Sequence, residues 1–81
     1  MRVRILVRPK EGILDPQGQA VERALPALGY DDVKHVHVGR LIELELDGAG
    51  GEDLTARVTE MCERLLANPL IESYEIERLD D

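Results

Sequence analysis

Cys62 carries the most nucleophilic side chain in the sequence and is its single cysteine. A catalytic thiolate needs an exposed, electropositive setting with a base nearby. Cys62 instead stands beside Met61 within a run of helically spaced apolar residues, where a free cysteine usually serves as a small buried hydrophobic residue. We therefore expect Cys62 to be a packing residue, and one cysteine excludes both a disulfide framework and a cysteine-built metal site.

The histidines and acidic residues form no complete metal or acid–base pattern. His35 and His37 would share one face of a strand, as a metal-binding pair does, but no third ligand stands at a suitable spacing. Glu43 and Glu45 resemble a carboxylate pair, although an exposed charged strand face explains them better. We predict neither a metal ion nor a cofactor in this chain.

The glycines match neither common phosphate-binding loop; they include Gly12, Gly18, Gly39 and Gly48. Lys10 could contact an anion with help from a nearby helix N-terminus, but by itself it makes no nucleotide site. Since nucleophile, base and oxyanion donors are not combined anywhere, the residues alone favour a small α+β binding or assembly module.

Periodic apolar residues show which elements position these side chains. Alternation predicts strands over residues 2–8, 33–38, 41–47 and 71–79, the middle two forming a hairpin that turns at Gly39 and Arg40. The first strand ends at Pro9, which cannot donate to a sheet ladder.

Two helices separate these strands. The first begins after Asp15, a good N-cap, with Pro16 as its first residue, and ends at Gly29, which suits a left-handed C-cap. Pro26 should kink it or shorten its last turn. The second helix, ended by Asn68 and Pro69, carries one apolar stripe, made of Leu54, Val58, Met61, Cys62, Leu65 and Leu66.

The order β-α-β-β-α-β predicts a ferredoxin-like plait of the α+β class, with an antiparallel sheet and both helices on one face. In this arrangement the first strand is central, between the third and the fourth. Its outward face then places arginines between two acidic strands; the residues are Arg2, Arg4 and Arg8 against Glu43, Glu45, Glu75 and Glu77.

Length and charge limit the remaining functions. The 81 residues allow one domain, residues 1–81, whose thin core favours a homodimer or a dimer of dimers. A net charge of −7, without Trp or Phe, argues against nucleic-acid binding. No run approaches a membrane span and no signal peptide is present, so we expect a reducing, cytoplasmic setting.

Three separated motifs are specific. They are PKEGILDPQG at residues 9–18, VHVGR at residues 36–40 and MCERLLANPLIESY at residues 61–74. In order and spacing they resemble PurS, the small-subunit family of phosphoribosylformylglycinamidine (FGAM) synthase. Within that pattern, His37 replaces a common arginine and Arg40 a commoner lysine.

The resemblance implies a role within a larger enzyme. That enzyme makes FGAM from formylglycinamide ribonucleotide (FGAR), ATP and glutamine in purine biosynthesis. Its large synthetase subunit holds ATP and magnesium, and its glutaminase subunit releases ammonia. The small subunit, without catalytic residues of its own, joins the two and assists ammonia transfer. A small-molecule regulatory module on the same plait is the alternative.

The loop between the first strand and first helix is the segment that we expect to contact partner subunits. Its ends are anchored, it is otherwise polar around two apolar side chains, and it is the most recognisable part of the resemblance. In the alternative interpretation, Leu14 covers the core and Lys10 is merely solvated. The predicted contact residues are Lys10, Ile13, Leu14, Asp15, Gln17 and Arg40.

Overall fold

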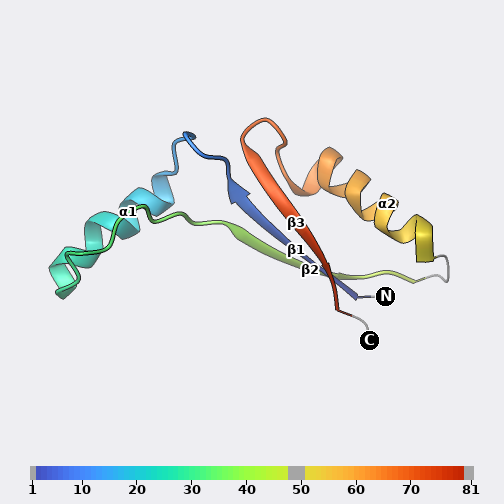
Figure 1. Ribbon diagram of the computed structural model, residues 1–81, viewed down its shortest axis with the longest axis horizontal. Coiled ribbons are helices and arrows are strands. Elements are labelled where there is room, and N and C mark those ends of the chain that lie inside the picture. Colours follow the sequence, from blue (N-terminus) through green and yellow to red (C-terminus); the bar gives the residue numbers. More distant parts are fainter. Residues whose placement is uncertain (1, 48–50, 80–81) are drawn as a thin grey trace.

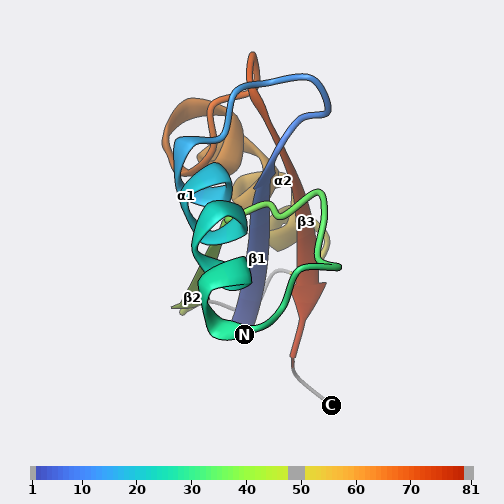
Figure 2. The ribbon, with the colours of Figure 1, turned by 90° about the vertical axis from the view of Figure 1, so that its left-hand side faces the viewer.

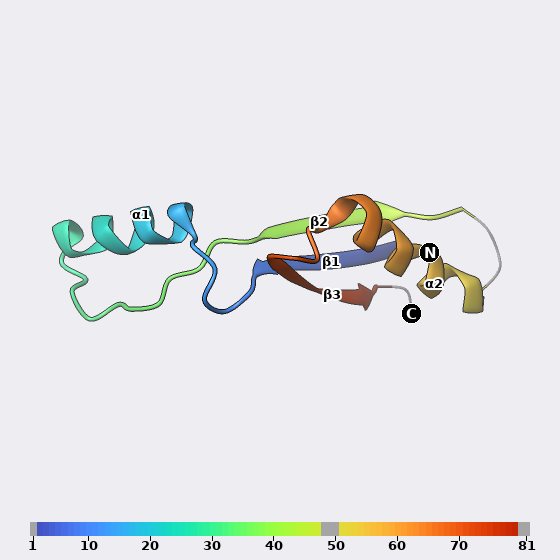
Figure 3. The same ribbon diagram turned by 90° about the horizontal axis from the view of Figure 1, so that it is seen from above.

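The protein is elongated. The computed structural model describes residues 2–47 and 51–79, with side chains omitted at 51–53, and its Cα trace measures 51 × 28 × 14 Å. The radius of gyration is 16.2 Å, whereas a compact chain of this length has about 12 Å. An arm that extends from the sheet accounts for the difference (Figures 1 and 3).

Three strands and two helices make up the described chain. They follow one another as β1 (Arg2–Pro9), α1 (Pro16–Ala24) with a 3₁₀ extension η1 (Leu25–Leu28), β2 (Arg40–Glu45), α2 (Gly51–Met61) with a π-helical end η2 (Cys62–Leu66), and β3 (Glu72–Arg78). Gly48 lies outside the described residues. The α+β class is confirmed.

The sheet has the order β2-β1-β3 and is antiparallel throughout, which confirms the central position of the first strand. The predicted charge pairing is also present on its outward face. The Arg4 guanidinium lies 3.5 Å from Glu43 and 3.6 Å from Glu77, and Arg8 lies 3.6 Å from Glu75. Each such exposed pair contributes little on its own.

The core lies between the inward face of the sheet and α2, as Figure 1 shows. It is built from small aliphatic side chains, and its buried members are Val3, Ile5, Val7, Val58, Cys62 and Ala67. The predicted position of Leu65 in the apolar stripe is wrong, because its side chain is 82% exposed. The wider π turn of η2 rotates the residues after Cys62 away from their α-helical positions.

The predicted strand over residues 33–38 and its hairpin are wrong. The Val36 and Val38 N–H groups donate to the carboxylates of Glu22 and Asp15, at 3.1 and 2.9 Å, instead of to a neighbouring strand. His35, with φ at 60°, also breaks the extended conformation. We call residues 30–39 the return segment because they run back beside α1 to the sheet (Figure 3).

The arm consists of α1, η1 and the return segment. It lies beyond one end of the sheet, so the prediction that both helices cover one face holds for α2 only (Figures 1 and 2). The predicted caps are confirmed: Asp15 caps α1 and Pro16 opens it, while Gly29 ends η1 with φ at 96°. Pro26 shortens the helix as expected, since its last turn is 3₁₀.

Replacement of Cys62 by alanine tests the core assignment. Because the Cys62 side chain is fully buried, Cys62→Ala should leave a small cavity and lower the free energy of unfolding by about 1 kcal/mol. Urea denaturation at fixed protein concentration measures this loss. Glu60→Ala, on the exposed side of α2, is the control, and equal stability of the two variants would show that Cys62 does not contribute to packing.

Candidate functional site

A groove lies at the neck of the molecule, where the arm joins the sheet. Three segments form it: the β1–α1 loop, the end of the return segment and the turn before β3. Its volume is about 670 Å³, and we call it the neck groove; it is lined by Pro9, Ile13, Leu14, Asp15, Pro16, Gln17, Val38, Gly39, Arg40, Ile71 and Glu72.

Five of the six predicted contact residues line the neck groove; they are Ile13, Leu14, Asp15, Gln17 and Arg40. The sixth, Lys10, lines a neighbouring cleft, which shares Pro9 with the groove. Leu14 is 69% exposed, so it does not cover the core. The fold thus brings Arg40 beside a loop more than twenty residues earlier in the chain.

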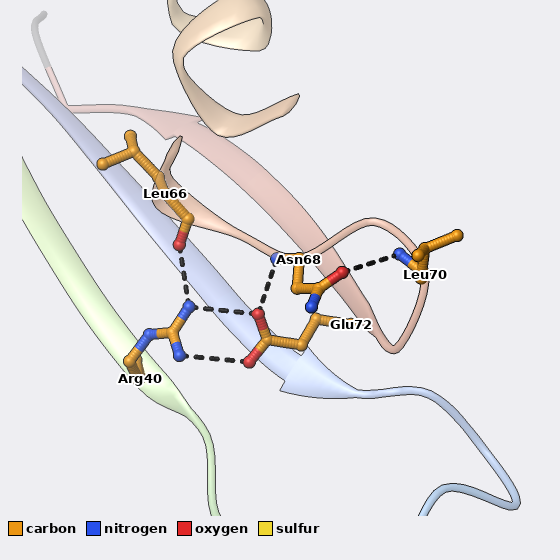
Figure 4. A network of polar contacts seen from close by, with 5 residues as sticks. All are labelled: Arg40, Leu66, Asn68, Leu70 and Glu72. Atoms are coloured by element: carbon orange, nitrogen blue, oxygen red, sulfur yellow. Dashed lines mark hydrogen bonds and ion pairs between the residues drawn. The ribbon is translucent and has the colours of Figure 1, made fainter. Parts of the chain in front are cut away.

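At the sheet end of the groove, the guanidinium of Arg40 binds both Glu72 and the Leu66 carbonyl (Figure 4). Its two terminal nitrogens donate to the two carboxylate oxygens of Glu72, each at 3.1 Å. One of them also donates to the Leu66 carbonyl at 2.7 Å, which η2 leaves without a partner in its own helix. Arg40 therefore ties β2, β3 and the end of the second helix together.

Glu72 completes this network on the opposite side. Its Oε1 accepts from the Asn68 N–H at 2.7 Å, and the Asn68 side-chain oxygen accepts from the Leu70 N–H at 3.1 Å (Figure 4). The backbone bond from Asn68 has the largest effect and lowers the pKa of Glu72. Burial acts in the opposite direction, and the hydrogen bond and charge of Arg40 add smaller lowering effects, so the pKa lies below its ordinary value.

Asp15 fixes the arm end of the groove. One carboxylate oxygen accepts from the Gly18 N–H at 3.0 Å, and the other accepts from the Val38 N–H at 2.9 Å and lies 3.5 Å from His37 Nδ1. The two backbone bonds, Val38 first, hold the pKa of Asp15 below its ordinary value, with a smaller contribution from His37. One side chain thus joins the start of α1 to the return segment.

Two glycines allow these close contacts. A Cβ atom on Gly18 would meet the Asp15 carboxylate and the Val36 carbonyl oxygen, and one on Gly39 would meet the Val7 carbonyl oxygen. All three neighbours are backbone or tightly held groups that cannot move aside cheaply. Any larger residue would therefore separate the return segment from α1 or from β1.

The β1–α1 loop is held in one shape, as expected. The Lys10 N–H donates to the Ile71 carbonyl at 2.9 Å, and the Lys10 carbonyl accepts from the Ile13 N–H at 3.2 Å. Gly12, with φ at 81°, supplies the left-handed position that this tight turn requires. A loop fixed in this way loses little entropy when a partner docks.

Outside the groove, the titratable groups whose pKa values are shifted, Cys62 and Tyr74, have structural roles. Burial, followed by the charge of Glu63, raises the pKa of the Cys62 thiol, which keeps it protonated and unreactive. The Tyr74 hydroxyl donates to Glu63 at 2.6 Å, and this bond, more than burial, raises the pKa of Tyr74 to about 12. The groove, mostly apolar with two satisfied carboxylates, is suited to binding and not to acid–base catalysis.

Among the side chains of residues 2–47 and 54–79, no three histidine, cysteine, aspartate or glutamate groups are placed so that they could hold a metal ion. The strand that would place His35 and His37 on one face is absent: His37 contacts Asp15, while His35 has a positive φ. No helix in the described part of the chain is long and apolar enough to cross a bilayer.

Four groove and network residues escape sequence reasoning: Val38, Asn68, Ile71 and Glu72. Asn68 before Pro69 signals a turn, but nothing in the sequence indicates that Glu72 receives bonds from both Arg40 and this turn. The antiparallel register brings Arg40 and Glu72 to the same end of the sheet, because it pairs Arg40 with Val7 and Glu72 with Pro9 on β1.

The lowered pKa values of Asp15 and Glu72 predict a loss of stability in acid. Both carboxyls return to ordinary values, 3.8 and 4.5, when the chain unfolds. Above these values their contribution is fully present. As the pH falls through and below them, the unfolded chain binds protons first, so the free energy of unfolding decreases. Urea denaturation at a series of pH values, at constant protein concentration, measures this slope.

Asp15→Asn and Glu72→Gln should each make the slope shallower. The matched control is Glu43→Gln, which removes an exposed carboxylate that contacts the Arg4 side chain. If the slope in all three variants equals that of the parent, the two network carboxylates do not determine the acid sensitivity.

The chain is similar to known proteins over nearly its whole length. The family model for phosphoribosylformylglycinamidine (FGAM) synthase, PurS, matches residues 2–80. The FGAM synthase subunit PurS of Bacillus subtilis is 45% identical over 76 residues, which cover 94% of this chain and 89% of that protein. The corresponding Methanocaldococcus jannaschii subunit is 40% identical over 72 residues, covering 89% of this chain and 87% of that protein.

Solved structures show the same fold. A crystal structure of B. subtilis PurS superimposes with a TM-score of 0.84 at 45% identity, covering 94% of each chain. A chain of the PurLQS structure from Thermotoga maritima also reaches 0.84, at 33% identity, covering 96% of this chain and 95% of that one. With its sequence motifs, its fold and these similarities in agreement, the chain belongs to the PurS family of FGAM synthase.

Proposed function

We propose that this chain is the small, non-catalytic subunit of an FGAM synthase complex, which converts FGAR, ATP and glutamine to FGAM in purine biosynthesis. The observation that carries the proposal is the shape of the surface, which combines a rigid neck groove with a protruding arm. In the described part of the chain, Cys62 is buried and the two groove carboxylates are occupied by hydrogen bonds within the chain. The similarity to a chain of the T. maritima PurLQS structure supports this role.

In this proposal, residues 1–81 act as one domain that joins the synthetase and glutaminase subunits and assists ammonia transfer between them. ATP and magnesium belong to the large subunit, and this chain holds no cofactor. The cytoplasm is the compartment of the complex, which agrees with a free, unoxidised Cys62.

The neck groove is our candidate for the contact with partner subunits. Ile13, Leu14 and Gln17 offer side chains to a partner, and Lys10 adds a cation at the edge. Arg40 and Asp15 are already engaged within the chain, as the network bonds indicate. Their proposed role is therefore to hold the groove in shape, so that a partner meets a preformed surface.

Self-association is the second part of the proposed partnership. The arm exposes several large apolar side chains that its own sheet does not cover: Val21, Leu28, Tyr30 and Val33. Leu28, the most exposed of them, is 71% accessible. Clustered apolar side chains on a protruding element are typical of an interface between subunits, so we propose a homodimer or a dimer of dimers.

A small-molecule regulatory module is the alternative. The neck groove, with about 670 Å³, falls in the size range of small-molecule sites. A regulatory module should be stabilised by its ligand without partner subunits, so thermal unfolding of the isolated chain with purine-pathway metabolites separates the two functions. A rise in melting temperature with one metabolite would favour regulation.

Substitutions in the β1–α1 loop test the docking surface. Lys10→Ala and Ile13→Ser should leave the isolated chain folded but weaken co-purification with the synthetase and glutaminase subunits. Because each substitution removes one side-chain contact with a partner subunit, we expect the affinity of the chain for its partners to decrease about tenfold. Glutamine-dependent FGAM synthesis should decrease in parallel. Synthesis from added ammonia should decrease less, since it bypasses the glutaminase.

Arg57→Ala, which removes an exposed cation from α2, is the control for this experiment. Circular dichroism of each isolated variant verifies that it is folded. Assembly and activity equal to those of the parent in both loop variants would place the contact elsewhere, and the outward face of the sheet would be the next surface to examine.

Analytical ultracentrifugation tests the role of the arm. At micromolar concentration the chain should sediment as a dimer or larger, and Leu28→Asp should shift it toward a 9.1 kDa monomer. Gln19→Glu adds one negative charge to the exposed surface of α1 and should leave the mass unchanged. A parent chain that is monomeric at these concentrations would refute self-association.

A further inference from the structure

A second cleft lies beside the neck groove and gathers basic side chains of this acidic protein. Its volume is about 480 Å³, within the range of small-ligand sites. We call it the Lys10 cleft; it is lined by Arg8, Pro9, Lys10, Glu11, His37 and Ser73. Three of these side chains can donate to an anion as cations and a fourth, Ser73, as a hydroxyl.

The sheet leaves the charge of Arg8 only partly compensated. Arg4, four residues earlier on the same face, stands opposite Glu43 on β2 and Glu77 on β3 in the sheet register. Arg8 stands opposite Ser73 on β3, and Gly39 approaches its backbone on the other side. Its ion-pair partner in the described part of the chain, Glu75, lies 3.6 Å away at an exposed position, so the guanidinium can still donate to a ligand.

Lys10 and His37 add donors on either side. The backbone of Lys10 is held by bonds to Ile71 and Ile13, while its ammonium has no ion-pair partner among the side chains of residues 2–47 and 54–79. His37 faces Asp15 with Nδ1 at 3.5 Å, which leaves Nε2 on the opposite side of the ring for a ligand.

Carboxylates also lie near the cleft and oppose the binding of an anion. Glu11 lines it directly, Glu75 contacts Arg8, and Asp15 contacts His37. These three acidic groups oppose any anion, so only a ligand with several acceptor oxygens, which can bind Arg8, Lys10 and His37 at once, gains enough to offset their repulsion.

We propose that the Lys10 cleft binds a phosphate group through Arg8, Lys10, His37 and Ser73. The ligand class is a free phosphate or the phosphate of a small phosphomonoester, both of which present the same tetrahedral dianion. The site belongs to the isolated chain, so its test does not depend on the proposed role in the complex.

The chain provides matched internal controls, since its two histidines and two lysines are each divided between the cleft and the rest of the surface. Histidine ring signals are recorded in NMR spectra across neutral pH, with and without millimolar sodium phosphate. Phosphate should raise the titration midpoint of His37 above its value without phosphate and should leave that of His35 unchanged. Lys10→Gln should weaken phosphate binding about tenfold, while Lys34→Gln should leave it unchanged.

Glu11→Gln gives a test that unfolding cannot imitate. Removal of the carboxylate that lines the cleft should strengthen phosphate binding about twofold. Ribose 5-phosphate compared with inorganic phosphate distinguishes the two sources, because tighter binding of the ester indicates that the sugar is also contacted. Equal responses of His35 and His37, an unchanged affinity in Lys10→Gln, or acetate acting as well as phosphate at equal ionic strength would each overturn the proposal.

Discussion

The carboxylate of Asp15 determines the direction in which the chain leaves the sheet. It caps α1 through the Gly18 N–H and, with its other oxygen, receives the Val38 N–H of the return segment. Glu22 repeats the second contact farther along the arm, at Val36. The side chains of Asp15, the N-cap of α1, and of Glu22 within α1 thus take the place of a neighbouring strand, and the arm depends on them.

At the sheet end, the ion pair between Arg40 and Glu72 has a corresponding role. Its charged groups are partly exposed, so Coulomb attraction alone would contribute little. Its value lies in geometry, since a planar guanidinium can bind both oxygens of one carboxylate and a helix-end carbonyl together. The neck groove lies between the Asp15 hydrogen bonds and the Arg40–Glu72 ion pair, so the backbone that carries its apolar side chains is held at both ends and cannot easily change shape.

Local patterns in the sequence identify most elements of the fold. Alternation in β1, β2 and β3, the caps of α1 and the apolar stripe of α2 each depend on a few neighbouring residues, and all were predicted. Residues 33–38 alternate equally well, yet their N–H groups bind Glu22 and Asp15. A pattern cannot reveal a competition that is decided by acceptors more than ten residues away.

The candidate site shows the same limit. The β1–α1 loop was recognisable because it is one continuous segment, and Arg40 because it lies in a specific motif. Glu72 and Asn68 were missed because their role arises from a register between β1 and β3 that joins the two ends of the chain. Leu65 was misplaced because a π turn changes the helical period, and such turns have no reliable sequence signal.

The separation of the arm from the core has a consequence for cooperativity. The core is closed by pairing β1 with β3, whereas the arm is held by the hydrogen bonds of its own side chains and leaves its apolar side chains exposed. The two parts can therefore open as distinct units. Amide hydrogen exchange in α1 should then become slower as the protein concentration rises, while exchange in β1 follows global unfolding. In the proposed dimer, a second copy would cover the apolar side chains of the arm and so complete the packing that one chain leaves open.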